Sequence, residues 1–194
     1  SSGNYQPDLT GGFSTTFRYK QFALGMNFDF LIGGKVASWT NMYGEVSGTA
    51  ASSAKINDRG VNEREPVAKG GGVHVVGVDT EGNPVDTYLN AYQWYHQKYY
   101  DTDSYMYDRT YVKMRELSFG YTFSRAQLKK YTKGVLSSAS LSFVATNPWL
   151  IYSAVPNIDA SEISTSSTSG YAQSIEGGSA GSTRSFGLTV KVGF

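Results

Sequence analysis

Strict alternation of apolar with small or polar residues is the feature that most constrains how this chain can fold. Every even position from 22 to 32 is apolar, and most odd positions between them are small or polar. The even positions from 186 to 194 are likewise apolar, with Gly, Thr or Lys between them. Because successive side chains of a β-strand point to opposite faces, this period of two residues indicates strands with one apolar face.

The same pattern predicts an all-β fold of five long antiparallel strands. These strands are expected near 11–20, 21–33, 110–123, 135–146 and 184–194. A tilted strand of about 9–11 residues can cross the hydrocarbon core of a membrane, whereas strands in soluble proteins usually have ~5–6 residues. The second face is rich in Ser, Thr and Gly, which suits a wet interior. We therefore expect the wall of a transmembrane β-barrel.

Composition supports a β-rich chain and excludes several classes of site. The 194 residues include 10 Phe, 15 Tyr, 3 Trp and 22 Gly but only 5 Pro, as is typical of strands joined by tight turns. The lack of Cys excludes thiolate zinc sites, iron–sulfur clusters and disulfides. The net charge of +1 gives no general attraction to nucleic acid, so no nucleic-acid partner is expected.

The predicted connections differ in length. The turn near 19–21 is very short and 124–134 is modest, whereas the loops 34–109 and 147–183 are long. Short turns on one side and long loops on the other are the layout of an outer-membrane barrel, whose long loops are extracellular. Within 34–109 the sequence predicts a small hairpin and one or two helical turns.

Basic residues interrupt the pattern at two places. Lys113 and Arg115 fall on the apolar parity of their strand, so they must lie beyond the bilayer or follow a β-bulge. A second basic group near a predicted turn is interpreted as solvent-exposed: Arg125, Lys129, Lys130 and Lys133.

Five strands are too few to close a membrane barrel. Bacterial single-chain barrels have an even number of strands, with a minimum of about 8. An open sheet edge in lipid would leave backbone groups unpaired, at several kcal/mol each. We therefore expect this chain to be the C-terminal portion of a larger barrel, with its missing neighbours on the N-terminal side.

Several motifs resemble the SusC/RagA-like family of TonB-dependent outer-membrane transporters. They include VVGVDTEGNPV at 75–85, RELSFGYTFS at 115–124 and TRSFGLTVKVGF at 183–194. The resemblance implies a plugged barrel of about 22 strands, with the plug and the segment that engages TonB upstream of this chain. It also implies a SusD-like surface lipoprotein that closes over the barrel, and an oligosaccharide or sometimes a peptide as substrate.

Aromatic residues of the first long loop are the candidate ligand or lid contacts. They are Trp39, Tyr43, Trp94, Tyr95 and Tyr99, with Tyr100 beside them. Aromatic rings stack well on sugar faces and supply contact area at interfaces. The alternative is that these rings pack the loop against the barrel rim or join an interfacial aromatic belt. Belt positions are expected at Tyr19, Tyr111, Tyr121 and Phe123.

The strands supply two further sets of candidate residues. Those expected to face the lumen are Asn27, Asp29, Glu116 and Thr122. Those at the end of the chain, Val190, Val192 and Phe194, match the aromatic-ended final strand that outer-membrane assembly machinery recognises in the proteins this sequence resembles.

The sequence offers little support for catalysis or metal binding. His74 and His96 have no second His at ligand spacing, and the acidic run 101–108 lacks the Gly and Glu of a calcium loop. We therefore expect no enzyme activity, cofactor or metal.

We expect TonB-dependent import of a nutrient, a glycan or oligosaccharide, across the outer membrane of a Gram-negative bacterium. Two alternatives stay open. One is a passive or structural outer-membrane barrel, such as a porin or adhesin anchor. The other is a soluble β-sandwich binding module, in which the apolar faces would form an interior.

Overall fold

The computed structural model describes residues 3–163, 175–178 and 181–194. These residues form two compact units. The sheet unit contains the described residues among 3–35, 108–163 and 180–194, and the loop unit contains those among 36–107 and 164–179.

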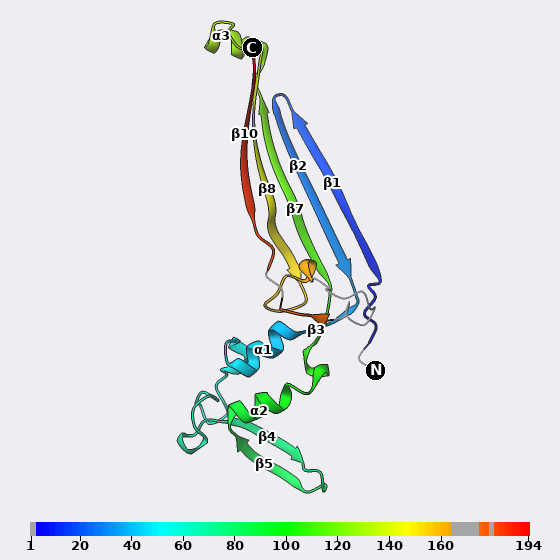
Figure 1. Cartoon of the computed structure of the whole chain (residues 1–194), viewed down its shortest axis with the longest axis vertical. Coiled ribbons are helices and arrows are strands. Elements are labelled where there is room, and N and C mark those ends of the chain that lie inside the picture. The colour runs from blue at the N-terminus through cyan, green and yellow to red at the C-terminus, as the bar shows by residue number, and fades with distance from the viewer. Residues whose placement is uncertain (1–2, 164–174, 179–180) are drawn as a thin grey trace. The chain divides into compact units, whose positions relative to one another are not determined.

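The sheet unit is built on an antiparallel sheet of five long strands (Figure 1). In hydrogen-bonding order they are β1 (Leu9–Tyr19), β2 (Phe22–Ile32), β7 (Tyr111–Thr122), β8 (Ser138–Ser153) and β10 (Ser185–Gly193). The chain is thus mostly β-strand with antiparallel pairing, as the alternation predicts. The pair β2–β7 joins strands that are far apart in the sequence, because the loop unit lies between them along the chain.

Register places the apolar side chains of all five strands on one face. Phe13 of β1 lies opposite Phe28 of β2, and the two rings stack with their centroids 4.6 Å apart. This face is open: Phe17 is 60% exposed and Leu188 is 69% exposed. A β-sandwich would bury such a face against a second sheet. The exposed face therefore contradicts the soluble β-sandwich hypothesis.

A β-bulge at Arg115 interrupts the pairing of β2 with β7. Glu116 pairs with Asn27, but the next pair is Met114 with Phe28, so Arg115 has no partner on β2. One extra residue reverses the parity of all residues on the far side of the bulge. The bulge, one of the two explanations for the misplaced basic residues, is therefore confirmed.

Because of the bulge, the side chains of the first residues of β7 lie on the face opposite to the one that uninterrupted alternation predicts. Lys113 consequently lies opposite Asp29 on the polar face, where its side chain is 1% exposed and its Nζ lies 2.6 Å from Asp159 Oδ2. Tyr111, which we expected in an aromatic belt, is buried on the same face. That expectation was wrong because it assumed that the two faces alternate without interruption along the whole strand.

Strand β8 differs from the strand expected at 135–146. It starts at Ser138 and continues to Ser153, so the following connection is shorter than the expected loop 147–183. An Asn-Pro pair is typical of a turn, but here Asn147 takes a positive φ of 51° and the register with β7 shifts at this point. A bulge tolerates Pro because no ladder hydrogen bond is required of its nitrogen, and the strand resumes beyond it.

The connections at one end of the sheet are short. Lys20 and Gln21 alone join β1 to β2, and Lys20 takes the left-handed conformation with φ 53°. The connection from β7 to β8, expected as a turn, contains the helix α3 (Arg125–Thr132). Ser124 and Gln127 form a capping box that starts this helix. At the other end, residues 33–110 and 154–184 form long connections.

The loop unit shows that the long loop expected at 34–109 is a folded structure. Its elements are β3 (Lys35–Ser38), α1 (Trp39–Ser47), β4 (Val73–Val78), β5 (Pro84–Leu89), α2 (Ala91–Lys98), β6 (Met106–Asp108) and β9 (Ile175–Glu176). The hairpin β4–β5 and the helix α2 stand where the sequence predicts a hairpin and helical turns. Its core includes Val36 and Tyr105, and the buried Glu45 accepts hydrogen bonds from Lys98 at 2.7 Å and Tyr105 at 2.9 Å.

No helix in the described parts of the chain is long and apolar enough to span a membrane.

Substitution of Lys113 tests the energetic weight of the buried group that the bulge brings to the polar face. Lys113→Met leaves Asp159 and Glu162 without their shared ammonium partner. Breaking a buried ion pair costs roughly 3–5 kcal/mol, so we expect the free energy of unfolding of the complete protein, measured by urea titration in detergent, to fall by about that amount. Lys191→Met, at an exposed lysine of β10, is the matched control and should change the stability little. Equal losses in the two variants would contradict the role of the buried ion pair.

Candidate functional site

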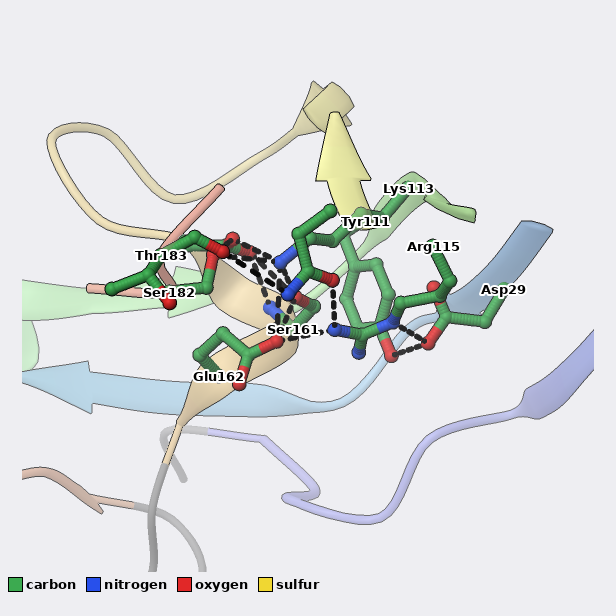
Figure 2. Close-up of polar contacts among 10 residues, drawn as sticks. Asp29, Tyr111, Lys113, Arg115, Ser161, Glu162, Ser182 and Thr183 are labelled. Atoms are coloured by element: carbon green, nitrogen blue, oxygen red, sulfur yellow. Dashed lines mark hydrogen bonds and ion pairs between the residues drawn. The ribbon is translucent and has the colours of Figure 1, made fainter. Parts of the chain in front are cut away.

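A cluster of charged side chains lies on the polar face of the sheet unit (Figure 2). At its centre is the ammonium group of Lys113, which donates to two carboxylates and two hydroxyls. The distances are 2.6 Å to Asp159, 3.1 Å to Glu162, 3.0 Å to Ser161 and 2.9 Å to Ser182. A buried ammonium group is tolerated only when it is paired and hydrogen-bonded in this way.

Arg115 extends the cluster along the sheet. Its Nε donates to Asp29 Oδ2 at 2.8 Å, and its Nη1 contacts Glu162 and Asn147. Tyr111 donates to the same oxygen of Asp29 at 3.4 Å. We call the residues joined by these contacts the latch cluster (Figure 2). They are Asp29, Tyr111, Lys113, Arg115, Asn147, Asp159, Ser161, Glu162 and Ser182.

The carboxylates of the connection after β8 are held in their charged form. Burial raises the pKa of Asp159, but hydrogen bonds from Lys113 and Ser161 outweigh it, so the pKa lies below its ordinary value. Burial likewise raises the pKa of Glu162, and the contacts with Arg115 and Lys113 bring it below the ordinary value. Both groups are therefore ionised near neutral pH.

The latch cluster fastens separate stretches of chain to one another. Residues 159–162 follow β8 and Ser182 precedes β10, and both are tied to side chains of β7. Every charged group of the cluster has an opposite charge as a partner. Such a set provides structural fixation, and it offers no free acid or base for catalysis.

The residues expected to face a lumen all lie on the polar face. Asn27 pairs with Glu116 across β2 and β7, and Thr122 lies opposite Ser140 of β8. Asp29 belongs to the latch cluster. The sequence identified Asp29 but not its basic partner Arg115, because the bulge changes the face to which the residues of β7 point.

The loop unit carries a continuous row of aromatic rings. In order of contact the rings are Trp39, Tyr43, Tyr99, Tyr100, His96 and Tyr92, with adjacent centroids 5.3–6.4 Å apart. We call it the aromatic row. Tyr100 is 72% exposed, and the hydroxyls of Tyr43 and Tyr99 lie 3.3 Å apart. The row brings together three of the five predicted aromatic contacts.

The row also includes His96 and Tyr92, which sequence reasoning did not assign to it. Their spacing of four residues, with Tyr100 four further on, was the available signal, because such residues share one face of a helix. The rings of Tyr92 and His96 stack with their centroids 5.6 Å apart.

The other two predicted aromatic residues lie elsewhere. Tyr95 is 4% exposed and its hydroxyl donates to Glu63 at 2.5 Å, so it supports the unit from inside. Burial and this hydrogen bond raise the pKa of Tyr95. Trp94 is half-buried and lines a pocket of about 410 Å³ with residues that include Asn57 and His74.

His74 holds the hairpin to the rest of the loop unit. Its Nδ1 lies 2.7 Å from Asp58 and its Nε2 lies 2.8 Å from Asp86, and its ring stacks on Tyr88. The hydrogen bond with Asp86 is the main cause that raises the pKa of His74. For this histidine we had considered only metal-ligand spacing, and its two aspartate partners were not expected.

Within the described ranges, no group of three or more His, Asp or Glu side chains is placed to hold a metal ion. In the acidic run, Asp101 accepts from Ser104 and Asp108 accepts from Thr110.

The candidate assembly residues belong to the apolar face at the end of the chain. Val190 and Val192 alternate along β10 and are exposed, and Phe194 follows directly after the strand.

Comparison with known proteins gives one curated relative and several solved structures. No protein-family profile matches the chain. Over 129 residues the chain is 29% identical to TonB-dependent receptor P3 of Formosa agariphila, a match that covers 66% of this chain and 10% of that receptor. The chain thus spans about a tenth of the length of the curated relative it matches. The resemblance to TonB-dependent transporters inferred from the sequence is confirmed by this relative.

The solved structures that match include those of the RagAB peptide importer. In its closed-closed state the TM-score is 0.43 at 11% identity, covering 76% of this chain and 14% of that one. A structure of the RagAB peptide transporter gives a TM-score of 0.41 at 13% identity, with the same coverage of both chains.

The ion pairs of the latch cluster should be lost at acid pH. Because the pKa values of Asp159 and Glu162 are lowered by folding, the stability they contribute is present above their ordinary values of about 4. This stability is lost as the pH falls through the pKa values of the two carboxyl groups in the folded protein. We expect hydrogen exchange in peptides covering 155–163 and 181–184, corrected for the intrinsic pH dependence, to accelerate below about pH 4.

Lys113→Met supplies the control for this prediction. Without the ammonium group the same peptides should exchange rapidly already at pH 7. If they remain as protected as in the unaltered protein, the latch cluster does not hold these segments.

Proposed function

We propose that this chain forms part of the wall and mouth of a TonB-dependent importer in the outer membrane of a Gram-negative bacterium. One observation carries the proposal: the five-stranded sheet has an exposed apolar face and a polar face that bears paired charges. A large exposed apolar surface is suited to lipid, and alternate residues of membrane strands face a wet lumen.

The sheet requires further strands on both sides. β1 and β10 form its edges, and an unpaired edge is costly in a bilayer because no water satisfies its backbone groups. In the proposal these strands are supplied by the rest of the protein, giving a closed barrel of about 22 strands. The plug and the segment that contacts the TonB complex belong to that remaining part.

The lengths of the connections set the orientation. The two-residue turn at Lys20 and the α3 connection lie at the end with short connections, and barrels of this kind keep their short turns in the periplasm. The loop unit and the latch cluster then belong to the extracellular side. There the latch cluster keeps 159–162 against the wall, and Asn27, Glu116 and Thr122 line the aqueous path.

The aromatic row is the proposed contact for a ligand or for a lid. Its exposed rings offer flat apolar faces, which fit the faces of sugars and also the surface of a protein partner. We propose a glycan, or alternatively a peptide, as the imported substrate, and a SusD-like surface lipoprotein as the lid. Trp94 lines a separate pocket on the same unit and is a further ligand contact in the proposal.

A passive or structural barrel is the second candidate, because the same two-faced sheet would serve it equally well. An upstream plug with a TonB-binding segment in the complete protein distinguishes the two. Its absence would exclude the importer.

A pair of neighbouring substitutions tests the membrane assignment. Leu188 lies on the apolar face of β10 and Thr189 on the polar face. An Arg facing lipid costs about 2–4 kcal/mol at mid-depth, so Leu188→Arg should strongly reduce the folded protein in the outer-membrane fraction, measured by heat-dependent gel mobility. Thr189→Arg should leave it nearly unchanged. Equal effects of the two variants would overturn the assignment of faces.

The aromatic row is tested by Tyr43→Ala and Tyr99→Ala in the complete protein on glycan and peptide arrays. Aromatic contacts contribute about 0.5–1.5 kcal/mol each beyond buried area, so each variant should bind roughly threefold to tenfold more weakly than the unaltered protein. Tyr131→Ala, at an exposed tyrosine of the sheet unit, is the control and should bind normally. If all three variants bind alike, the row does not contact the ligand.

A further inference from the structure

The helix α3 gathers basic side chains around a pocket. Arg125, Lys129 and Lys133 are spaced four residues apart, which places them on one side of the helix and its C-cap. They line a pocket of about 330 Å³ together with Gly134, Leu136 and Ser137.

The helix is held firmly against the sheet. Its capping box fixes the first turn, and Leu128 is buried beneath it. Gln127 donates to the hydroxyl of Tyr121 on β7 at 2.6 Å. The backbone positions of the three exposed basic residues are therefore set before any ligand arrives.

No Asp or Glu side chain in the described chain pairs with these side chains. The carboxyl group of Phe194 accepts a hydrogen bond from the pocket residue Ser137 at 3.2 Å, but no ion pair joins it to the three basic residues. Between Glu116 and Asp159 the sequence contains no Asp or Glu, and the ion pairs of the described residues involve none of the three. Like charges at this spacing destabilise a helix. An anion in the pocket would remove that repulsion.

Exposed apolar side chains are also present at this end of the sheet unit. Tyr131 is 73% exposed, and Val135 is exposed directly after the helix. On the neighbouring strands, the rings of Phe22, Tyr121 and Phe123 contact one another on the apolar side of the sheet. A ligand with both a phosphate and acyl chains meets both kinds of surface.

We infer that this pocket binds the phosphate of an anionic phospholipid, phosphatidylglycerol, in the leaflet at the short-turn end of the barrel. Guanidinium and ammonium groups donate charge-assisted hydrogen bonds to phosphate oxygens, and the adjacent aromatic rings lie where acyl chains begin. The inference rests on the proposed membrane assignment. A free phosphate would use only the basic half of the site.

Lipid binding to the complete protein in detergent, followed by native mass spectrometry, tests the inference. The probes are short-chain phosphatidylglycerol, the zwitterionic phosphatidylcholine of the same chain length, and inorganic phosphate. We expect phosphatidylglycerol to bind most tightly. Each basic residue near an anionic headgroup strengthens binding roughly fivefold, so Lys129→Gln should weaken the affinity for phosphatidylglycerol by about that factor.

Lys130→Gln is the matched control. It removes the same charge from the same helix, but Lys130 does not line the pocket and lies over the ring of Tyr131. Its affinity for phosphatidylglycerol should change less than twofold. Equal losses in the two variants, or inorganic phosphate binding as tightly as the lipid, would overturn the inference. A protein that reaches the outer membrane but shows no preference for phosphatidylglycerol refutes only this site, whereas a protein absent from that membrane refutes the proposed function.

Discussion

Hydrogen bonding between β2 and β7 is the constraint on which the rest of the structure depends. These strands are separated in sequence by the loop unit, and their pairing joins the hairpin β1–β2 to the strands β7, β8 and β10 in one sheet. The pairing also fixes which side chains share a face. A shift of one residue exchanges the two faces of a strand, and at Arg115 the chain uses such a shift to bring Lys113 beside Asp29.

The consequence is a polar face whose charges are paired locally. Burial of the Lys113 ammonium group without a partner would be strongly destabilising. Carboxylates from the connection that follows β8 pair with it and offset this effect. The same ion pairs hold that connection in place. The bulge, the buried ammonium group and the fixed connection are therefore a single arrangement, in which each part contacts the others.

The two ends of the sheet have different chemistry. One end has short connections, exposed aromatic rings and the basic helix α3, a combination suited to the boundary between acyl chains and headgroups. The other end has long connections and the charged latch cluster. In the proposed importer this difference separates the side that rests in the membrane surface from the side that meets substrate.

The sequence by itself determined the periodic properties of this protein. The alternation predicted long antiparallel strands with one apolar face, and it identified the parity conflict at Lys113 and Arg115, because side-chain direction in a strand follows from position alone. Only the tertiary structure decided what depends on contacts between distant residues. The continuation of β8 past Pro148, the burial of Tyr95, the pairing of His74 with two aspartates and the order of rings in the aromatic row each depend on partners that local patterns do not specify.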